Sequence, residues 1–316
     1  MIKKLISFVI PAYKEEKNVP LLYKELISSF QQIQEKYDYE IIFVNDGSPD
    51  DTWGAIQKLC EEDKNVVGVN LSRNFGKEIA ISAGMDYVNG DAVITLDGDG
   101  QHPVEKIPDF IQEWENGYDM VYNKRPKTKN ASFFKKLSSK FFYLIYNTFS
   151  DFKLEPDTTD YRLLDKKLVE DFKKFSEKNR MYRGLTDWLG YNKKALVFDA
   201  KERLDNGESS YTYKQLYNLA INSLTSFSVL PLKMVGYLGF LMTFISGALF
   251  LLVIIDKFTI NKFSFSNIAA ILLVNTILIG IVLMSLGLMA LYIAKIHQEV
   301  QGRPMYIVKN KINFKK

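Results

Sequence analysis

Short apolar runs alternate with longer amphipathic stretches through the first half of the chain. The apolar runs, which are rich in Val, Ile and Phe and typical of buried strands, cover residues 7–13, 40–46, 66–71, 92–97 and 119–123. Between them, apolar positions recur at helical spacing over residues 19–37, 52–63, 78–89 and 104–116. Strands that alternate with helices in this way predict a largely parallel sheet with helices on both faces. We therefore predict a Rossmann-like α/β domain over residues 1–210.

Two long apolar stretches replace this pattern near the C-terminus. Residues 234–255 and residues 263–294 contain no charged side chain. Because a helix rises about 1.5 Å per residue, about 20 apolar residues suffice to cross a hydrocarbon core about 30 Å thick. We predict two transmembrane helices, near residues 234–255 and 267–294, that form a C-terminal hairpin. A buried hairpin in a soluble protein is the alternative.

Three other segments have a composition that favours contact with a membrane. Residues 211–232 have apolar positions at helical spacing and are predicted to form an amphipathic helix at the interface. Residues 132–149 interleave aromatic side chains with lysines, which indicates either a membrane-surface helix or a core-facing helix with a solvated lysine face. Residues 295–316 form a basic tail, so the positive-inside rule places both termini and the α/β domain in the cytoplasm of a bacterial-type cell.

Overall composition excludes several other classes of protein. Lys and Arg number 41 and Asp and Glu number 37, so bulk charge gives no reason to expect nucleic acid as a partner. The single cysteine, Cys60, excludes an internal disulfide framework and is compatible with a reducing compartment. His102 and His297 lie far apart, which disfavours a His-rich metal site. The N-terminus has no sustained apolar core, so we expect no secretory signal peptide.

The strongest candidate for chemistry is the pair Asp97 and Asp99, which directly follows a predicted strand. Residues i and i+2 of an extended backbone point to the same side, so both carboxylates can face one spot beyond the strand's carboxyl end. Ligands bind at that edge of open α/β sheets. Two carboxylates beside glycines suit a divalent cation that carries a diphosphate. The alternative is that Asp97 and Asp99 form an acidic turn at the protein surface that binds no ligand.

The ends of the other predicted strands also carry polar side chains. Tyr13 can stack on a nucleotide base, and Glu15 or Asp46 can accept a hydrogen bond from the base or the ribose. Arg73 and Lys77 can face phosphate or the metal-bound carboxylates. No GxGxxG follows the first strand and no Walker sequence is found, which disfavours dinucleotide-dependent dehydrogenases and P-loop NTPases.

Four segments together resemble the family 2 glycosyltransferases of GT-A fold. In order and spacing these are VIPAYKEEKNVP, VNDGSPDDT, LSRNFGKEIAISAGMD and LDGDGQHPVEKIP. They are most similar to the branch that loads a sugar onto a polyprenyl phosphate, which includes dolichol-phosphate mannose synthases and undecaprenyl-phosphate glucosyltransferases. The resemblance covers roughly residues 5–232 and extends into the apolar tail. It implies an α/β GT-A catalytic domain followed by the two-helix membrane hairpin.

The resemblance also implies roles for individual residues on the donor side. The positions expected to bind the nucleotide sugar are Pro11, Tyr13, Glu15, Asp46, Lys77, Asp97 and Arg203. Asp97 and Asp99 are expected to hold Mg²⁺ or Mn²⁺ on the diphosphate, with Gln101 as a further metal ligand. Gly100 replaces the more usual Leu, which loosens the loop but removes no ligand.

On the acceptor side, the related synthases grip the lipid phosphate with an Arg that follows a strand and with residues on the next helix. This implies lipid-phosphate binding by Arg125, Lys135 and Ser139. The segment DTTDYRLLD, residues 157–165, resembles a family motif in which a carboxylate lies near the anomeric carbon. Asp160 is our first choice for this catalytic role, together with Asp99 through the metal; Asp157 and Glu177 are the reserves.

Whether Asp160 acts as a base or only orients the acceptor stays open. A phosphate monoester is already ionised near pH 7, because its second pKa is about 6, so orientation and electrostatics could suffice. The expected reaction is inverting transfer of one hexose from a nucleotide-diphosphate sugar to polyprenyl phosphate at the cytoplasmic membrane face. A UDP-glucose-type donor is favoured, and GDP-mannose is the alternative donor. A second copy of the chain, in a homo-oligomer, is a further candidate partner.

Two other functions remain as alternatives. A processive polysaccharide synthase is disfavoured because the chain has no Q-x-x-R-W segment and no bundle of spans for a polymer channel. A membrane-anchored protein could also bind nucleotide sugars without turnover. The intact Asp97, Asp99 and Asp160 carboxylates argue against that reading.

Overall fold

The computed structural model describes residues 3–125, 155, 157–178, 180–198, 241 and 267–314. The chain divides into two compact units. The first comprises Met1–Tyr143, Phe152–Ser210 and Arg303–Lys316, and the second comprises Leu144–Asp151 and Tyr211–Gly302. The C-terminal residues therefore belong to the same unit as the N-terminal half.

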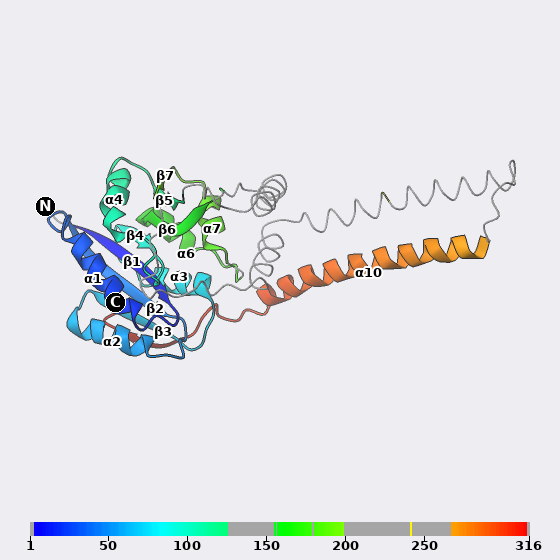
Figure 1. The fold of residues 1–316 in the computed structure, drawn as a ribbon, viewed down its shortest axis with the longest axis horizontal. Coiled ribbons are helices and arrows are strands. Elements are labelled where there is room, and N and C mark those ends of the chain that lie inside the picture. The colour runs from blue at the N-terminus through cyan, green and yellow to red at the C-terminus, as the bar shows by residue number, and fades with distance from the viewer. Residues whose placement is uncertain are drawn as a thin grey trace. The chain divides into compact units, whose positions relative to one another are not determined.

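The described part of the first unit is built on an eight-stranded mixed sheet with the order β7-β5-β6-β4-β1-β2-β3-β8 (Figure 1). The strands are β1 Lys4–Ala12, β2 Tyr37–Asn45, β3 Val66–Leu71, β4 Ala92–Thr95, β5 Met120–Lys124, β6 Thr158–Asp165, β7 Lys193–Val197 and β8 Val308–Ile312. The central strands β4, β1, β2 and β3 are parallel, whereas β6 runs antiparallel to both β4 and β5. Strand β8 runs antiparallel to β3, and β7 runs parallel to β5.

Helices cover both faces of this sheet (Figure 1). The helices are α1 Asn18–Phe30, α2 Thr52–Glu62, α3 Lys77–Met85, α4 Ile107–Glu115 after a 3₁₀ turn at Val104–Lys106, α6 Lys166–Lys173 and α7 Tyr182–Trp188. Because side chains alternate along a strand, Ile41 and Phe43 of β2 join one core with α1, α2 and α4. Ile42 and Val44 join the other core with α3, against which α6 and α7 also pack.

The predicted α/β sheet is confirmed, and each of the five predicted strands is found with its ends moved by at most three residues. The sheet is mixed rather than largely parallel, because β6 and β8 enter it antiparallel. β6 is buried along nearly its whole length on both faces, so its polar and apolar residues show no alternation that would predict a strand.

The C-terminal segment completes one edge of the sheet. Tyr306 donates a hydrogen bond from Oη to Asp86 Oδ2 at 2.6 Å, just before β8 pairs with β3. Just after β8, Asn313 Nδ2 donates to the carbonyl oxygens of Cys60 at 2.6 Å and Val66 at 3.0 Å. Residues 308–312 of the basic tail are therefore an integral strand of the first unit.

In the second unit the structure describes helix α10, Asn267–Val300, which begins where the second membrane helix was predicted. Large aliphatic side chains on it are exposed, among them Ile271, Leu286 and Ile293. Within the described part of the chain, no helix combines the length and apolarity needed to cross a membrane. The predicted helices at 132–149, 211–232 and 234–255 lie outside the described residues, apart from residue 241.

Candidate active site

The carboxyl ends of β1, β2 and β4 meet at one edge of the sheet and carry the predicted site residues. Gly98 allows the loop after β4 to pass against the end of β1, because a Cβ at this position would lie 2.9 Å from the Pro11 carbonyl oxygen. This close approach places Asp97 and Asp99 beside the strand that leads into Tyr13. Pro11 itself is buried within β1, opposite Val44 of β2.

Asp97 is held by two basic side chains. Its Oδ1 lies 2.6 Å from Lys77 Nζ, and its Oδ2 lies 3.3 Å from His102 Nε2. Burial by itself would raise the pKa of Asp97, but the Lys77 ammonium and His102 hold it well below its usual range. Asp97 is therefore a carboxylate at any pH at which the protein would work.

Lys77 also reaches the catalytic candidate Asp160, to which its Nζ donates a hydrogen bond at 2.6 Å. From the other side, Arg183 Nε donates to Asp160 Oδ1 at 2.6 Å, and Arg183 Nη1 donates to the Thr158 carbonyl oxygen at 2.9 Å. Burial would raise the pKa of Asp160, but Arg183 and Lys77 hold it well below the usual value. Asp160 is 3% exposed and is thus a buried, ionised carboxylate with two cationic partners.

Glu78 adds a third carboxyl group next to this cluster. Tyr182 donates its backbone N–H to Glu78 Oε2 at 2.7 Å, which ties the start of α3 to the start of α7. Burial and the nearby charge of Asp160 raise the pKa of Glu78 to about 7. Glu78 therefore changes its charge near neutral pH, while Asp160 does not.

The loop after β1 is positioned by bonds to the loop after β2. Lys14 N donates to Ser48 Oγ at 3.1 Å, and Glu15 N donates to Thr52 Oγ1 at 2.9 Å. Lys14 has φ 61, a left-handed conformation that is uncommon for a non-glycine residue. The Tyr13 side chain before it is 42% exposed and so presents a ring surface to solvent.

Asp46 fixes the loop that carries Lys77. Phe75 N donates to Asp46 Oδ1 at 2.7 Å, and Gly76 N donates to Asp46 Oδ2 at 2.9 Å. Burial raises the pKa of Asp46 above its usual value, although both backbone donors oppose this. Both oxygens are thus engaged by backbone in this structure, and a direct contact between Asp46 and a nucleotide stays a prediction.

The described residues offer a partial set of metal ligands. Asp97 Oδ1 is a buried oxygen without an aligned hydrogen bond, although it forms the ion pair with Lys77. Asp99 Oδ1 accepts a hydrogen bond from Gln101 N at 3.1 Å, across Gly100, whose φ of 71 would strain a Leu there. Within the described residues, no three or more His, Cys, Asp or Glu side chains form a group that could hold a metal ion. The carboxylate pair fits Mg²⁺ or Mn²⁺ only if substrate phosphates complete the ligand set, as is common for Mg²⁺.

The acceptor-side candidates are described only in part. Arg125 directly follows β5, is exposed, and donates its backbone N–H to the Asp157 carbonyl oxygen at 2.8 Å. Asp157 and Glu177, the reserves for the catalytic role, are both exposed, in contrast to buried Asp160. Lys135, Ser139 and Arg203 lie outside the described residues. The structure thus brings together Lys77, Asp97 and Asp160.

Sequence reasoning gave no role to three residues of this cluster: His102, Glu78 and Arg183. His102 directly follows Gln101 in the loop after β4, and Arg183 lies at the start of α7. Glu78 and Arg183 have partners that are distant in sequence, Tyr182 and Asp160, whereas His102 contacts Asp97 of the same loop. Neither periodicity nor spacing predicts which of these groups meet.

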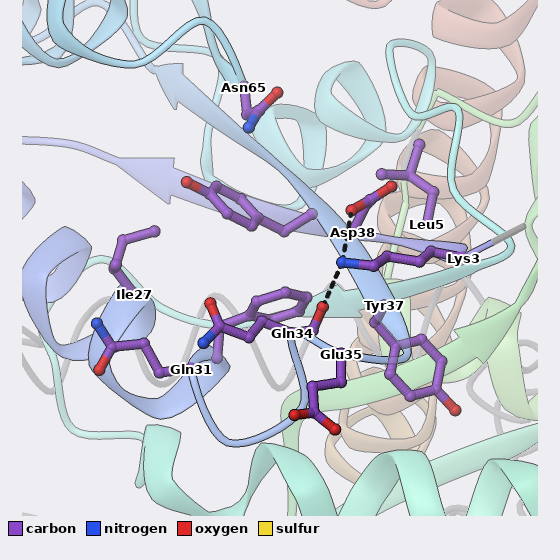
Figure 2. Close-up of a pocket in the computed structure, with 11 residues that line it drawn as sticks. Lys3, Leu5, Ile27, Gln31, Gln34, Glu35, Tyr37, Asp38 and Asn65 are labelled. Atoms are coloured by element: carbon purple, nitrogen blue, oxygen red, sulfur yellow. Dashed lines mark hydrogen bonds and ion pairs between the residues drawn. The ribbon is translucent and has the colours of Figure 1, made fainter.

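The cavity shown in Figure 2 lies at the other end of the strands. It has a volume of about 780 Å³ and is lined by residues at the starts of β1 and β2 and by the end of α1. Lys3 crosses it, donating to the Gln34 carbonyl oxygen at 2.6 Å and pairing with Asp38 at 3.9 Å. It is separate from the carboxyl edge and contributes nothing to the candidate active site.

The structure thus has a pair of aspartates at the carboxyl edge of an α/β sheet, and comparison with known proteins identifies the class of protein. The family model "Glycosyl transferase family 2" matches residues 7–172, and the chain belongs to this family. The family predicted from the sequence motifs is thereby confirmed, and with it the prediction that the protein is an enzyme of the glycosyltransferase class.

Similar proteins match nearly the whole chain. An uncharacterized glycosyltransferase of Synechocystis, sll0501, is 37% identical over 303 residues, which is 96% of this chain and 94% of that protein. The SfII prophage-derived bactoprenol glucosyl transferase of Shigella flexneri is 36% identical over 304 residues, which is 96% of this chain and 97% of that protein.

Among solved structures, a similar one is glucosyl-3-phosphoglycerate synthase of Mycobacterium tuberculosis in complex with Mn²⁺, UDP-glucose and phosphoglyceric acid. Its TM-score is 0.44 at 16% identity, over 70% of this chain and 78% of that chain.

Proposed function

We propose that this glycosyltransferase transfers a single hexose from a nucleotide-diphosphate sugar to polyprenyl phosphate, with inversion at the anomeric carbon. The observation that carries the proposal is the Lys77 ammonium, which contacts Asp97 of the donor-side pair and Asp160 at the same time. The similarity to bactoprenol glucosyl transferases supports a bactoprenol-type lipid acceptor and a glucosyl donor, for which we propose UDP-glucose. GDP-mannose is the second donor to test.

In this proposal Asp160 orients the acceptor rather than removing a proton. An efficient general base has a pKa near the working pH, and Arg183 and Lys77 keep the pKa of Asp160 far below that range. The acceptor phosphate needs no base, because it is already ionised near pH 7. One of its oxygens attacks the anomeric carbon, the bond to the diphosphate breaks, and the electron pair leaves with the nucleoside diphosphate.

The donor is assigned to the carboxyl edge beside Asp97. Tyr13 offers a ring for the base, and Glu15 and Asp46 lie on the loops that would hold the nucleoside. Mg²⁺ or Mn²⁺ held by Asp97 and Asp99, with Gln101 nearby, would neutralise charge that develops on the leaving diphosphate. Arg203 is proposed to contact the same diphosphate.

We assign the acceptor to the carboxyl end of β5, where exposed Arg125 follows the strand. Arg125 is proposed to bind the lipid phosphate, with Lys135 and Ser139 as further ligands. A lipid acceptor requires the protein to work at a bilayer, and the exposed aliphatic side chains of α10 and the apolar stretch 234–255 support attachment there. We propose that both termini lie on the cytoplasmic side.

The test is release of nucleoside diphosphate by the full chain in detergent with MgCl2 or MnCl2. Each of a panel of UDP- and GDP-sugars is offered with and without undecaprenyl phosphate. We expect one sugar to give release that requires the lipid. Release that is independent of the lipid would identify a hydrolase or another acceptor, and donor binding without any release would support the non-catalytic alternative.

A further inference from the structure

Lys77 occupies a central position between carboxylates that come from different strands. It is the first residue of α3 and follows Gly76. Gly76 has a φ of 100°, a backbone conformation that glycine adopts easily and other residues rarely adopt. Its Nζ lies 2.6 Å from Asp97 Oδ1 and 2.6 Å from Asp160 Oδ2, while its side chain keeps 33% exposure. The ammonium thus bridges the two carboxylates, while part of the Lys77 side chain is open to solvent.

The two bridged carboxylates depend on Lys77 to different degrees. Asp160 has Arg183 as a second cationic partner at 2.6 Å, so it remains paired if Lys77 leaves. Asp97 has only the more distant His102 at 3.3 Å on its other oxygen, within the part of the chain that is described. Asp97 Oδ1 makes no aligned hydrogen bond. If Lys77 moved away, this oxygen would therefore be free to bind another cation.

We propose that Lys77 is a built-in counter-cation of Asp97 that keeps divalent metal ions from binding the free enzyme and moves to the donor's diphosphate when donor and metal bind together. This inference rests on the proposed function, since it takes a nucleotide-diphosphate sugar as the anion. Lys77 would thereby set the order of binding, because the metal ion would bind together with the donor and not before it.

The physical basis is competition between like charges for one carboxylate. An ammonium at 2.6 Å already satisfies Asp97 and repels a second cation that approaches the same oxygen. A diphosphate removes this penalty, because its negative charge can take over the ammonium. Lysine suits the exchange, since its charge sits on a flexible four-carbon stem with donors that rotate.

The experiment measures binding of MnCl2 alone, followed by the electron paramagnetic resonance signal of free Mn²⁺. It compares the full chain with Lys77→Met and with Lys106→Met as a charge-matched control. Lys106 pairs only with Asp109 at the surface among the ion pairs of the described residues, at 3.4 Å. We expect Lys77→Met to bind Mn²⁺ at least about tenfold more tightly than wild type and Lys106→Met to match wild type. UDP or GDP should strengthen Mn²⁺ binding strongly in wild type and much less in Lys77→Met.

Mn²⁺ affinity of Lys77→Met that equals wild type or falls below it would overturn the proposal. Should Lys77→Met be unstable, Mn²⁺ should restore its melting temperature, and instability that Mn²⁺ does not reverse would likewise contradict it. Lys77→Arg keeps the charge and should bind Mn²⁺ no more tightly than wild type. This experiment measures no sugar transfer. If Lys77→Met binds Mn²⁺ more tightly but the wild-type protein is inactive towards every donor, the result contradicts only the proposed function.

Discussion

The charge state of Asp160 follows from its neighbours and decides what it can contribute to catalysis. Lys77 and Arg183 both donate to it, so a proton would have to displace two ionic contacts. As an ionised, fixed carboxylate it can position the two cations and the acceptor, but it is a weak proton acceptor. Its neutral isostere therefore tests electrostatic positioning directly.

Asp160→Asn is expected to lower kcat about 10²–10³-fold, the range seen when one preorganised electrostatic contact is removed, with the KM for the donor nearly unchanged. Asp38→Asn is the matched control, because Asp38 is exposed and pairs only loosely with Lys3 at 3.9 Å. Steady-state kinetics at saturating lipid distinguish the two. A kcat for Asp160→Asn within twofold of wild type would remove Asp160 from the reaction.

Glu78 gives the molecule a pH-dependent stability. Its carboxyl has an ordinary pKa of 4.5 and a pKa of about 7 in the folded chain, so the folded state binds more protons between these values. The free energy of unfolding therefore falls as pH rises from about 4.5 to 7, and it stays at the lower value above pH 7, where Glu78 is charged in the folded state.

Glu78→Gln removes that charge and can still accept the hydrogen bond from Tyr182 N. We expect the variant to melt about 6–12 °C higher than wild type at pH 8, because a rise of the pKa from 4.5 to about 7 corresponds to about 3 kcal/mol, and to match it near pH 4.5. Thermal unfolding across this pH range measures the difference. A constant offset at all pH values would show that packing, and not ionisation, separates the two proteins.

Among the elements, β8 shows how the C-terminal segment is fastened to the sheet. Asn313 follows β8 with φ 58, and its Nδ2 donates to the carbonyl oxygens of Cys60 and Val66. Asparagine tolerates this left-handed conformation, whereas alanine would be strained there and would lose the hydrogen bonds to these carbonyls.

Asn313→Ala should therefore destabilise the first unit by about 1–2 kcal/mol, or about 2–8 °C in melting temperature. Asn310→Ala is the matched control, because Asn310 is exposed within the same strand. Equal melting temperatures for the two variants would mean that β8 contributes little to holding the edge.

The elements that could be predicted from the sequence are those with a local signature. Strands β1 to β5 and helices α1 to α4 show their period directly, and the i, i+2 spacing of Asp97 and Asp99 marks the donor-side pair. Strand β6 is buried on both faces, and β8 is a short basic segment, so neither shows alternation. The contacts of Lys77 and Arg183 with Asp160 join different elements and required coordinates.

At the scale of the whole molecule, the first unit is discontinuous in sequence, because it takes in Arg303–Lys316 as well as the N-terminal half. Cutting the chain at residue 210 removes β8 and exposes the edge of β3. A version of the chain in which a long Gly/Ser linker replaces residues 211–302 keeps β8.

The linked version should melt cooperatively at a clearly higher temperature than residues 1–210 alone, since β8 pairs with the open edge of β3. If residues 1–210 melt at the same temperature as the linked version, the C-terminal strand is dispensable for the catalytic unit.

The same two proteins test membrane attachment. Both should leave the membrane fraction if residues 211–302 supply the anchor. If they still sediment with membranes, residues 132–149 are indicated as a second attachment site.

The proposed transfer leaves its product on the lipid, so the decisive measurement is made on the lipid itself. Undecaprenyl phosphate is incubated with the full chain, the donor selected by the panel and MgCl2, and extracted for mass spectrometry and NMR; Asp99→Ala serves as the inactive control. We predict lipid phosphate heavier by a single hexose, with inverted anomeric configuration, made by wild type and absent with Asp99→Ala. Lipid that carries several hexoses, that keeps the donor's configuration or that stays unmodified would contradict inverting transfer of a single hexose to polyprenyl phosphate.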